Sequence, residues 1–280
     1  MSQRSEGQFF GSDKSLLYFQ KWSQRSPKAT LIITHGQAEH SGCYTRLVEA
    51  LQPLKIDIYA WDLRGHGKSA GLRGYAPSFS AYADDFQLFL RELTGQRSLL
   101  NLPFFLLGHS MGGLIQAKTL SEHPTLPVTA QILCSPMFGI SVKVPEYKNI
   151  AANYLQQILP KLTLGNEIDF TDLTRDKSVL AEFHKDVLRH DRISSGVYVG
   201  SKNAMSELRA RAGQITVPTL MLIPENDPVT SSSAATEIFE RISATQKTLH
   251  TYANCKHELF NDLDRELVFA DLKSFLNKYI

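Results

Sequence analysis

The chain has 280 residues, of which 42% are hydrophobic and 21% charged, and its formal net charge is +2 at pH 7. This length suits one large domain, or one domain with an insertion, and so small a net charge gives no reason to expect a nucleic-acid partner. The three cysteines, Cys43, Cys134 and Cys255, are an odd number at distant positions, which argues against a disulfide framework or a zinc site.

The N-terminal stretch 1–7 is polar and lacks the apolar segment of a signal peptide. No stretch of the sequence approaches the length of a membrane span. We therefore expect a cytoplasmic protein, whose only contact with a membrane would be peripheral, at its inner surface.

The predicted elements alternate between strands and helices. A hairpin is expected from the loosely alternating stretches 8–10 and 15–22. Apolar runs then predict strands over 29–34, 56–61, 104–107, 130–134, 219–223 and 248–252. Helical spacing predicts helices over 45–51, 79–93, 113–120, 234–242 and 263–279. This order predicts an α/β fold with a mostly parallel central sheet and helices on both faces.

The alternation breaks between Pro136 and Gly213, a stretch too long for an ordinary connection. We interpret residues 136–213 as a helical cap, inserted over the carboxyl ends of the strands. The core domain would then comprise residues 1–135 and 214–280.

Within the cap, apolar residues recur at helical spacing. They are Tyr147, Ile150, Ala151, Tyr154, Leu155, Ile158 and Leu159. The favoured interpretation is a cap helix packed on the core, and the alternative is a lid whose apolar face meets a membrane or an acyl chain. Either way, Tyr154, Leu155 and Ile158 are expected to contact the substrate.

A Gly-x-Ser-x-Gly motif, Gly108 to Gly112, stands between a predicted strand and a predicted helix. A serine between two glycines at such a turn is typical of a nucleophile elbow, where the hydroxyl of Ser110 projects above the sheet. The following helix directs its N-terminal N–H groups at the same point.

A serine hydroxyl needs a base, and the base needs an acid that orients it. His257 follows the last predicted strand, and Asp227 follows the strand that ends near residue 223, so both should lie at the same sheet edge as Ser110. Glu225 is the runner-up for the acid, whereas Asp62 precedes the serine and fits the expected order badly.

The negative charge that develops on a tetrahedral intermediate needs preorganised donors. The backbone N–H of Met111, directly after the serine, is one candidate. The N–H of Gln37, in the loop after the strand 29–34, is the other, because Gly36 lets the backbone come close.

Four motifs in order resemble those of the α/β-hydrolase superfamily, and in particular of monoacylglycerol lipases and bacterial lysophospholipases. They are His35 to Tyr44 (H-G-x-x-E-H-S-x-R-Y in that family), Asp62 to Ser69 (D-x-R-G-H-G-x-S), Gly108 to Gly113 (G-H-S-M-G-G) and His257 to Asn261 (H-E-x-x-N). The resemblance implies a triad of Ser110, Asp227 and His257, with Gln37 and Met111 as oxyanion donors. Cys43 departs from the pattern, which usually has arginine there.

Other motifs fail on inspection. Gly65 to Ser69 ends like a phosphate-binding loop, but that motif needs glycine where Asp62 stands. His257-Glu258 is not followed by a second histidine at Asn261, so no metalloprotease site is expected and no metal or other cofactor is implied. A dehalogenase or epoxide hydrolase of this fold would carry aspartate at position 110, whereas C–C bond hydrolases and perhydrolases keep the serine and remain rivals.

The sequence thus predicts a serine hydrolase that cleaves the ester of a single-chain lipid, monoacylglycerol or lysophospholipid, through an acyl-enzyme on Ser110. Two alternatives stay open: a general carboxylesterase for short acyl esters, and a non-catalytic ligand-binding protein on the same scaffold. Cys255, two residues before His257, is a further hypothesis, as a thiol near the site whose modification would inhibit.

Overall fold

The computed structural model of the chain describes residues 3–95, 102–142 and 144–280. The remaining residues, 1–2, 96–101 and 143, fall inside the predicted core and cap ranges and lie outside the described residues.

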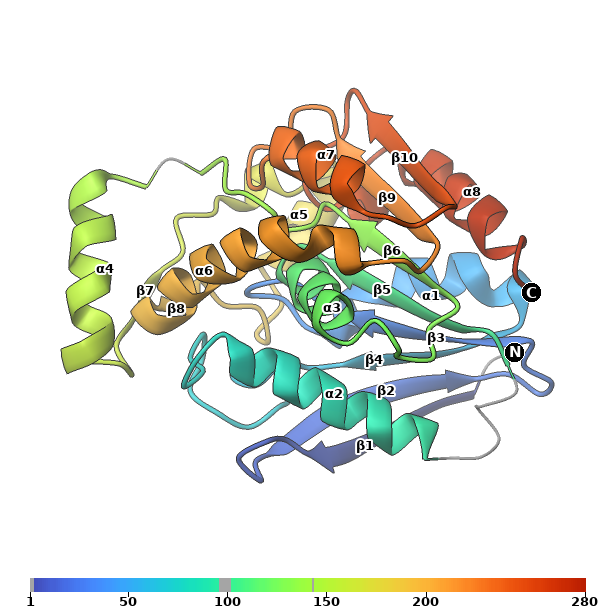
Figure 1. Cartoon of the computed structure of the whole chain (residues 1–280), viewed down its shortest axis with the longest axis horizontal. Coiled ribbons are helices and arrows are strands. Elements are labelled where there is room, and N and C mark those ends of the chain that lie inside the picture. The colour runs from blue at the N-terminus through green and yellow to red at the C-terminus, as the bar shows by residue number, and fades with distance from the viewer. Residues whose placement is uncertain (1–2, 96–101, 143) are drawn as a thin grey trace.

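One eight-stranded sheet forms the centre of the molecule, in the order β1-β2-β4-β3-β5-β6-β9-β10 (Figure 1). Its strands are β1 (Gln3–Phe10), β2 (Leu16–Ser23), β3 (Ala29–Thr34), β4 (Ile56–Trp61), β5 (Phe104–His109), β6 (Ala130–Cys134), β9 (Thr219–Pro224) and β10 (Lys247–Tyr252). β2 pairs antiparallel with both neighbours, whereas β4, β3, β5, β6, β9 and β10 pair in parallel. The mostly parallel sheet is confirmed.

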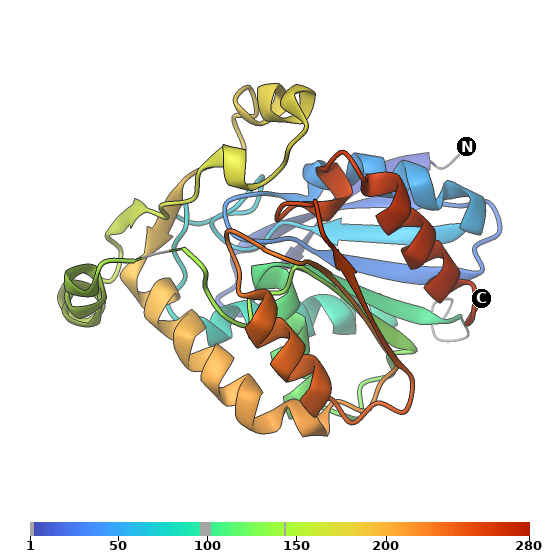
Figure 2. The same ribbon diagram turned by 90° about the horizontal axis from the view of Figure 1, so that it is seen from above.

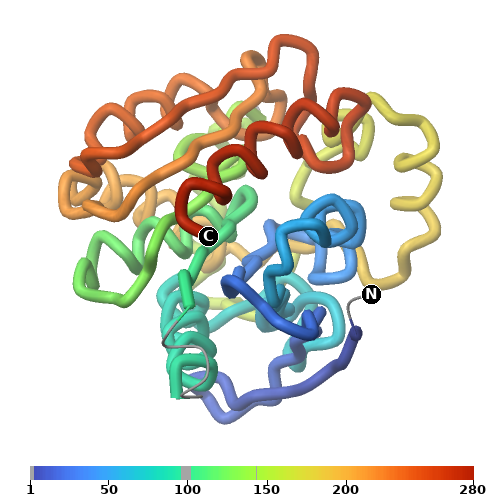
Figure 3. Tube along the Cα trace, turned by 90° about the vertical axis from the view of Figure 1, so that its right-hand side faces the viewer, coloured from blue at the N-terminus to red at the C-terminus, as the bar shows by residue number. Residues whose placement is uncertain are grey.

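Helices cover both faces of the sheet, as its fully buried central strands require. α1 (Thr45–Leu51) and α8 (Arg265–Leu276) pack on one face, where Figure 3 shows the red α8 beside the blue α1. α2 (Ser80–Thr94), α3 (Met111–Glu122) and α7 (Ser232–Arg241) pack on the other. The last helix is shorter than the predicted 263–279, because residues 263–264 and 277–279 form turns.

The inserted segment after β6 forms a second layer. It contains α4 (Glu146–Ile158), β7 (Thr163–Gly165), α5 (Lys177–Phe183), β8 (Arg192–Ser194) and α6 (Ser195–Arg211). α6 packs along α3, whereas α4 stands well away from the sheet in both Figure 1 and Figure 2. We propose that residues 136–213 act as one cap, anchored to the core by α6.

α4 corrects the favoured interpretation of its apolar stripe. Instead of packing on the core, the helix buries only Ala152. Tyr154 is 68% exposed and Ile158 71% exposed. None of the described helices has both the length and the apolar character needed to cross a membrane.

A buried ion pair holds the loop after β4 against α2. Arg64 donates from Nε and Nη2 to the two carboxylate oxygens of Asp85, at 2.6 and 2.7 Å. Its Nη1 reaches Asp13 at 2.7 Å, in the turn between β1 and β2. Three segments far apart in the sequence are therefore joined at one guanidinium, and the loop's position depends on it.

Replacing Asp85 with alanine should destabilise the protein by about 3–5 kcal/mol, because a buried guanidinium loses its main partner. Chemical denaturation of the purified variant measures the change. Asp84→Ala is the matched control, since Asp84 is the exposed neighbour on the same helix and should change stability by less than about 0.5 kcal/mol. Equal stability of both variants would contradict this role for the pair.

Candidate active site

Ser110 occupies a strained turn between β5 and α3. Its backbone has φ 50° and ψ −119°, a region that side-chain-bearing residues rarely adopt. The residue is held there because its N–H donates to Cys134 O of β6 at 3.0 Å, and its carbonyl accepts the first bond of α3 from Gly113 N. This geometry is that of a nucleophile elbow, at the carboxyl edge of the sheet.

The glycines around Ser110 are required by close backbone contacts. A Cβ on Gly112 would lie 2.1 Å from the carbonyl oxygen of Thr34 in β3, so the start of α3 could not approach the sheet. A Cβ on Gly36 would lie 2.9 Å from the Cβ of Ser110. The small residues thus bring the loop after β3 directly against the serine.

His257 and Asp227 lie together at the same edge, on the loops after β10 and β9. His257 Nδ1 and Asp227 Oδ2 are 2.8 Å apart, and both side chains are buried. Asp227 also accepts from the N–H groups of Val229 and Thr230 and from the Thr230 hydroxyl. The carboxylate is therefore fixed in the orientation that places the imidazole proton on Nδ1 and leaves Nε2 free as a base.

The surroundings of this pair shift both pKa values. Burial disfavours the charged imidazolium, but the negative charges of Asp227, Glu258 and Glu39 outweigh it and raise the pKa of His257. Burial opposes ionisation of Asp227 as well, yet the His257 partner and the backbone donors hold the pKa of Asp227 below its usual value. The arrangement stabilises an imidazolium beside a carboxylate, as proton transfer from a serine requires.

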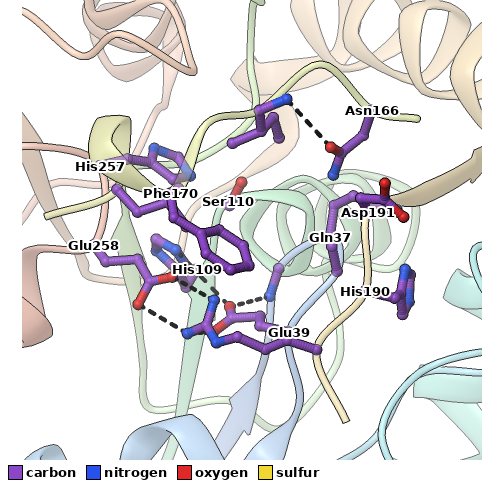
Figure 4. A pocket seen from close by; sticks show the side chains of 15 residues that line it. Gln37, Glu39, His109, Ser110, Asn166, Phe170, His190, Asp191, His257 and Glu258 are labelled. Atoms are coloured by element: carbon purple, nitrogen blue, oxygen red, sulfur yellow. Dashed lines mark hydrogen bonds and ion pairs between the residues drawn. The ribbon is translucent and has the colours of Figure 1, made fainter. Parts of the chain in front are cut away.

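Ser110 and His257 line one small cleft with Gln37 and His109 (Figure 4). The cavity within it is only about 40 Å³, about the room that one water occupies. The residues that close it from above come from the inserted segment: Asn166, Ile168, Phe170, Leu173, Arg189, His190 and Asp191. The inserted segment therefore limits the room beside Ser110.

Of the two expected oxyanion donors, Gln37 lines this cleft and Met111 directly follows Ser110, which lines it. Among the hydrogen bonds of the described residues, neither the Met111 N–H nor the Gln37 N–H has a protein acceptor. Gln37 is held in place through its side chain, whose Nε2 donates to Arg192 O of β8 at 2.6 Å. We propose these two N–H groups as the oxyanion hole.

The rejected acids lie elsewhere. Glu225 is exposed to solvent. Asp62 accepts from the N–H groups of Ser41 and Lys68 at 2.7 Å and so ties its own loop to the 3₁₀ turn Ser41–Tyr44 that precedes α1.

The three cap residues that were predicted to contact the substrate have different surroundings. Leu155 lines a cavity of about 480 Å³ between α4, β7, β8 and α6, whereas Tyr154 and Ile158 lie outside its lining. The helical spacing put all three on one stripe but could not say which part of it meets the cavity.

Cys255 does not line the cleft around Ser110. Its side chain is buried in the apolar cluster beneath α1 and α8, and burial raises its pKa to about 11. A neutral, inaccessible thiol reacts slowly, so the structure corrects the idea of a reactive cysteine at the site.

A buried charge cluster that the sequence patterns did not predict lies beside His257. Glu39 and Glu258 both contact Arg189 from the inserted segment, and Glu39 Oε1 lies 3.8 Å from His109 Nε2 (Figure 4). Both acids stand inside the family motifs, which was the available signal. The arginine stands in a segment where no motif marks it.

His40, Cys43 and Asp186 are close enough together to be tested as a metal site. His40 Nδ1 accepts from Gly42 N, so its proton lies on Nε2, which donates to Asp186 at 2.7 Å. Burial raises the pKa of the Cys43 thiol, which stays neutral. His40 and Asp186 already satisfy each other through this hydrogen bond, and we assign no metal ion there.

Comparisons with known proteins cover nearly the whole chain. The model of the serine aminopeptidase S33 family (Hydrolase_4) matches residues 25–264. The chain is 33% identical over 261 residues to monoglyceride lipase of Homo sapiens, covering 90% of this chain and 83% of that protein. It is 28% identical over 260 residues to phospholipase YtpA of Bacillus subtilis, covering 92% and 99%. The crystal structure of a Paleococcus ferrophilus monoacylglycerol lipase aligns over 100% of both chains, with a TM-score of 0.84 and 28% identity.

The raised pKa of His257 predicts how the rate depends on pH. Because the base must be unprotonated, kcat/KM for a water-soluble ester should fall on the acid side with an apparent pKa above the ordinary 6.5 of histidine. Asp227→Asn removes the main charge that raises this pKa, so the acid limb should move to lower pH while kcat drops about 10⁴-fold. Pre-steady-state and steady-state pH profiles measure both effects.

Glu225→Gln serves as the control for this experiment, since that carboxylate is exposed. It should leave the profile in place. A profile that follows Glu225→Gln, or one that Asp227→Asn leaves unmoved, would contradict the assignment of the acid.

Proposed function

This chain belongs to the serine aminopeptidase S33 (Hydrolase_4) family of α/β-hydrolases, and from that premise we propose that it cleaves the carboxylic ester of single-chain lipids, monoacylglycerol or lysophospholipid. It is a carboxylic ester hydrolase. The observation that carries the proposal is the strained Ser110 on one cleft with His257, whose Nδ1 is bonded to Asp227.

The reaction follows from these positions. His257 Nε2 takes the proton of the Ser110 hydroxyl, whose oxygen attacks the ester carbonyl, and the N–H groups of Met111 and Gln37 stabilise the oxyanion. The tetrahedral intermediate collapses, the C–O bond breaks, and His257 returns its proton to the departing alcohol. Water, deprotonated by His257, then attacks the acyl-enzyme and releases the fatty acid.

The cap supplies a place for the acyl chain. Its cavity of about 480 Å³ has the size of a small-molecule site and is lined mainly by apolar side chains such as Ala151, Leu155 and Ile193. Asn166 lines both this cavity and the cleft at Ser110, so the two are neighbours. A single chain that enters the cavity can present its carbonyl to the serine.

A panel of substrates tests the reaction and its specificity. The protein should hydrolyse monoacylglycerol or lysophosphatidylcholine faster than short p-nitrophenyl esters, and leucine p-nitroanilide hardly at all, because the cap cavity binds an apolar chain. Ser110→Ala should lose about 10⁴-fold or more in kcat. A fluorophosphonate should label the wild type but not this variant.

Other results would redirect the assignment. Fastest turnover of the acetyl ester, with no gain along a series from acetyl to palmitoyl, would favour a general carboxylesterase. Absence of labelling and turnover with intact lipid binding would favour the ligand-binding protein.

The exposed face of α4 supports a second proposal, peripheral contact with a lipid surface. Tyr147, Ile150, Tyr154, Ile158 and Leu159 are all more than half exposed on this one segment. Tyr147 also lines the cavity proposed for the acyl chain, and such a face is typical of helices that lie in a membrane interface. The cytoplasmic compartment and contact with its inner membrane surface stay predictions.

Replacing both Ile150 and Leu159 with serine should weaken binding to phosphatidylcholine vesicles about 10-fold or more. Each replacement removes an exposed apolar side chain that would be buried in the lipid interface. Vesicle co-sedimentation measures it. Leu267→Ser is the control, because Leu267 is as exposed but lies on α8. Unchanged binding of the double variant would argue against this surface.

A further inference from the structure

Arg189 is a cation that the inserted segment places inside the core. It stands between α5 and β8, and its side chain is only 4% exposed. Its guanidinium carbon lies 3.7 Å from the ring centroid of Phe183, the last residue of α5. Burying an arginine costs free energy of folding unless nearby acids neutralise its charge, so Arg189 needs acidic partners in the core.

Those partners are two buried carboxylates of the core. Arg189 Nη1 and Nη2 donate to the two oxygens of Glu258 at 2.9 and 3.1 Å, a two-pronged ion pair. Glu39 Oε2 lies 4.0 Å from the same guanidinium. Glu258 directly follows His257, and the other oxygen of Glu39 accepts from Gly36 N at 2.6 Å, in the loop that carries Gln37.

Cys43 lies close to the same charged groups. Cys43 lines one small cavity with Glu39 and Glu258, and a second, of about 340 Å³, with Arg189. The second cavity has room for a longer side chain at position 43. The motif that begins at His35 usually carries arginine at this very position, and a cation there would face the same two acids.

We propose that Arg189 is a positioning residue for the catalytic histidine, and that it supplies from the inserted segment the positive charge that the related motif carries at position 43. In this chain position 43 is the neutral Cys43 and the cation is Arg189; we call this the exchange of positions 43 and 189. The effect of Arg189 on the reaction rests on the proposed function. The exchange of positions 43 and 189 affects the stability of the fold and can be tested without any activity.

The charges around His257 say what this cation does. His257 faces Asp227 from the loop after β9, Glu258 on its own loop, Glu39 from the loop after β3 and His109 from β5. The first three are acids that raise the pKa of His257, while burial lowers the pKa of His109 to about 3 and keeps that ring neutral.

Arg189 is the cation that offsets two of these acids. Glu39 already has its pKa raised to about 7 by burial and by Glu258, with Arg189 opposing that rise. Without Arg189 the histidine would face more uncompensated negative charge, and its pKa would rise further. The backbone of Gln37, held through Gly36 and Glu39, would lose a support as well.

Four variants test the inference: Arg189→Met, Arg189→Lys, Cys43→Arg and the double variant Cys43→Arg/Arg189→Met. Arg189→Met should move the acid limb of the kcat/KM profile upward by about one pH unit and lower Tm by roughly 5–10 °C. Arg189→Lys keeps the charge and should lie nearer the wild type in the profile. The double variant should recover at least half of both changes, because an arginine at 43 faces the same acids.

The control is Arg209→Met, which removes an exposed arginine of α6 far from this cluster. It should change neither profile nor Tm. Cys43→Arg alone, with two cations against two acids already paired, should not raise Tm.

Each outcome decides. If the double variant has the same acid limb and the same Tm as Arg189→Met, the exchange of positions 43 and 189 is wrong. If Arg189→Met does not fold, the test is whether the double variant folds, and failure to fold contradicts the exchange. If Arg189→Met lowers Tm but leaves the pH profile of kcat/KM unchanged, the positioning role is wrong and Arg189 only stabilises the fold. Fluorophosphonate labelling of Ser110 reports separately on the proposed function, since the Tm coupling of positions 43 and 189 needs no activity.

Discussion

The close packing of β3, β5 and α3 around Ser110 is the constraint on which the site depends. The serine keeps its left-handed backbone only because Gly36 and Gly112 let three backbones approach within distances that any side chain would block. The same approach brings Gln37 and the start of α3 beside Ser110. Backbone packing therefore sets the positions of the proposed nucleophile and of the proposed oxyanion donors.

The inserted segment does more than cover this cleft. Its β8 accepts a hydrogen bond from the Gln37 side chain, and its Arg189 enters the core to neutralise Glu39 and Glu258. The part that bears these contacts is pinned to the core at the reacting groups. α4 buries only Ala152 and makes none of these contacts with the reacting groups; it packs on α6. The inserted segment thus has a part joined to the site and a part that stands away from the sheet.

The amino-acid pattern predicted the sheet strand by strand, because fully buried parallel strands read as unbroken apolar runs between turn signals. It also identified Ser110, His257 and Asp227 as candidates, since this fold brings strand ends to one edge and orders the acid after the serine. The pattern did not predict which residues of the apolar stripe on α4 face the cap cavity. Tyr154 and Ile158 share their spacing with Leu155, yet only Leu155 lines the cavity, because what a helix faces depends on neighbours distant in the sequence.

By itself, then, the sequence determined the fold class and the family and marked Ser110 as the candidate nucleophile, since each rests on local patterns of glycine, serine and apolar residues. The tertiary structure alone decided which surfaces are covered and which charges meet. Cys255 is two residues from His257 but packs on the far face, whereas Arg189, 69 positions from Glu258 and 150 from Glu39, lies between them. Sequence distance says little about charge pairing, because a buried ion is neutralised by whatever the completed fold brings within a few ångströms.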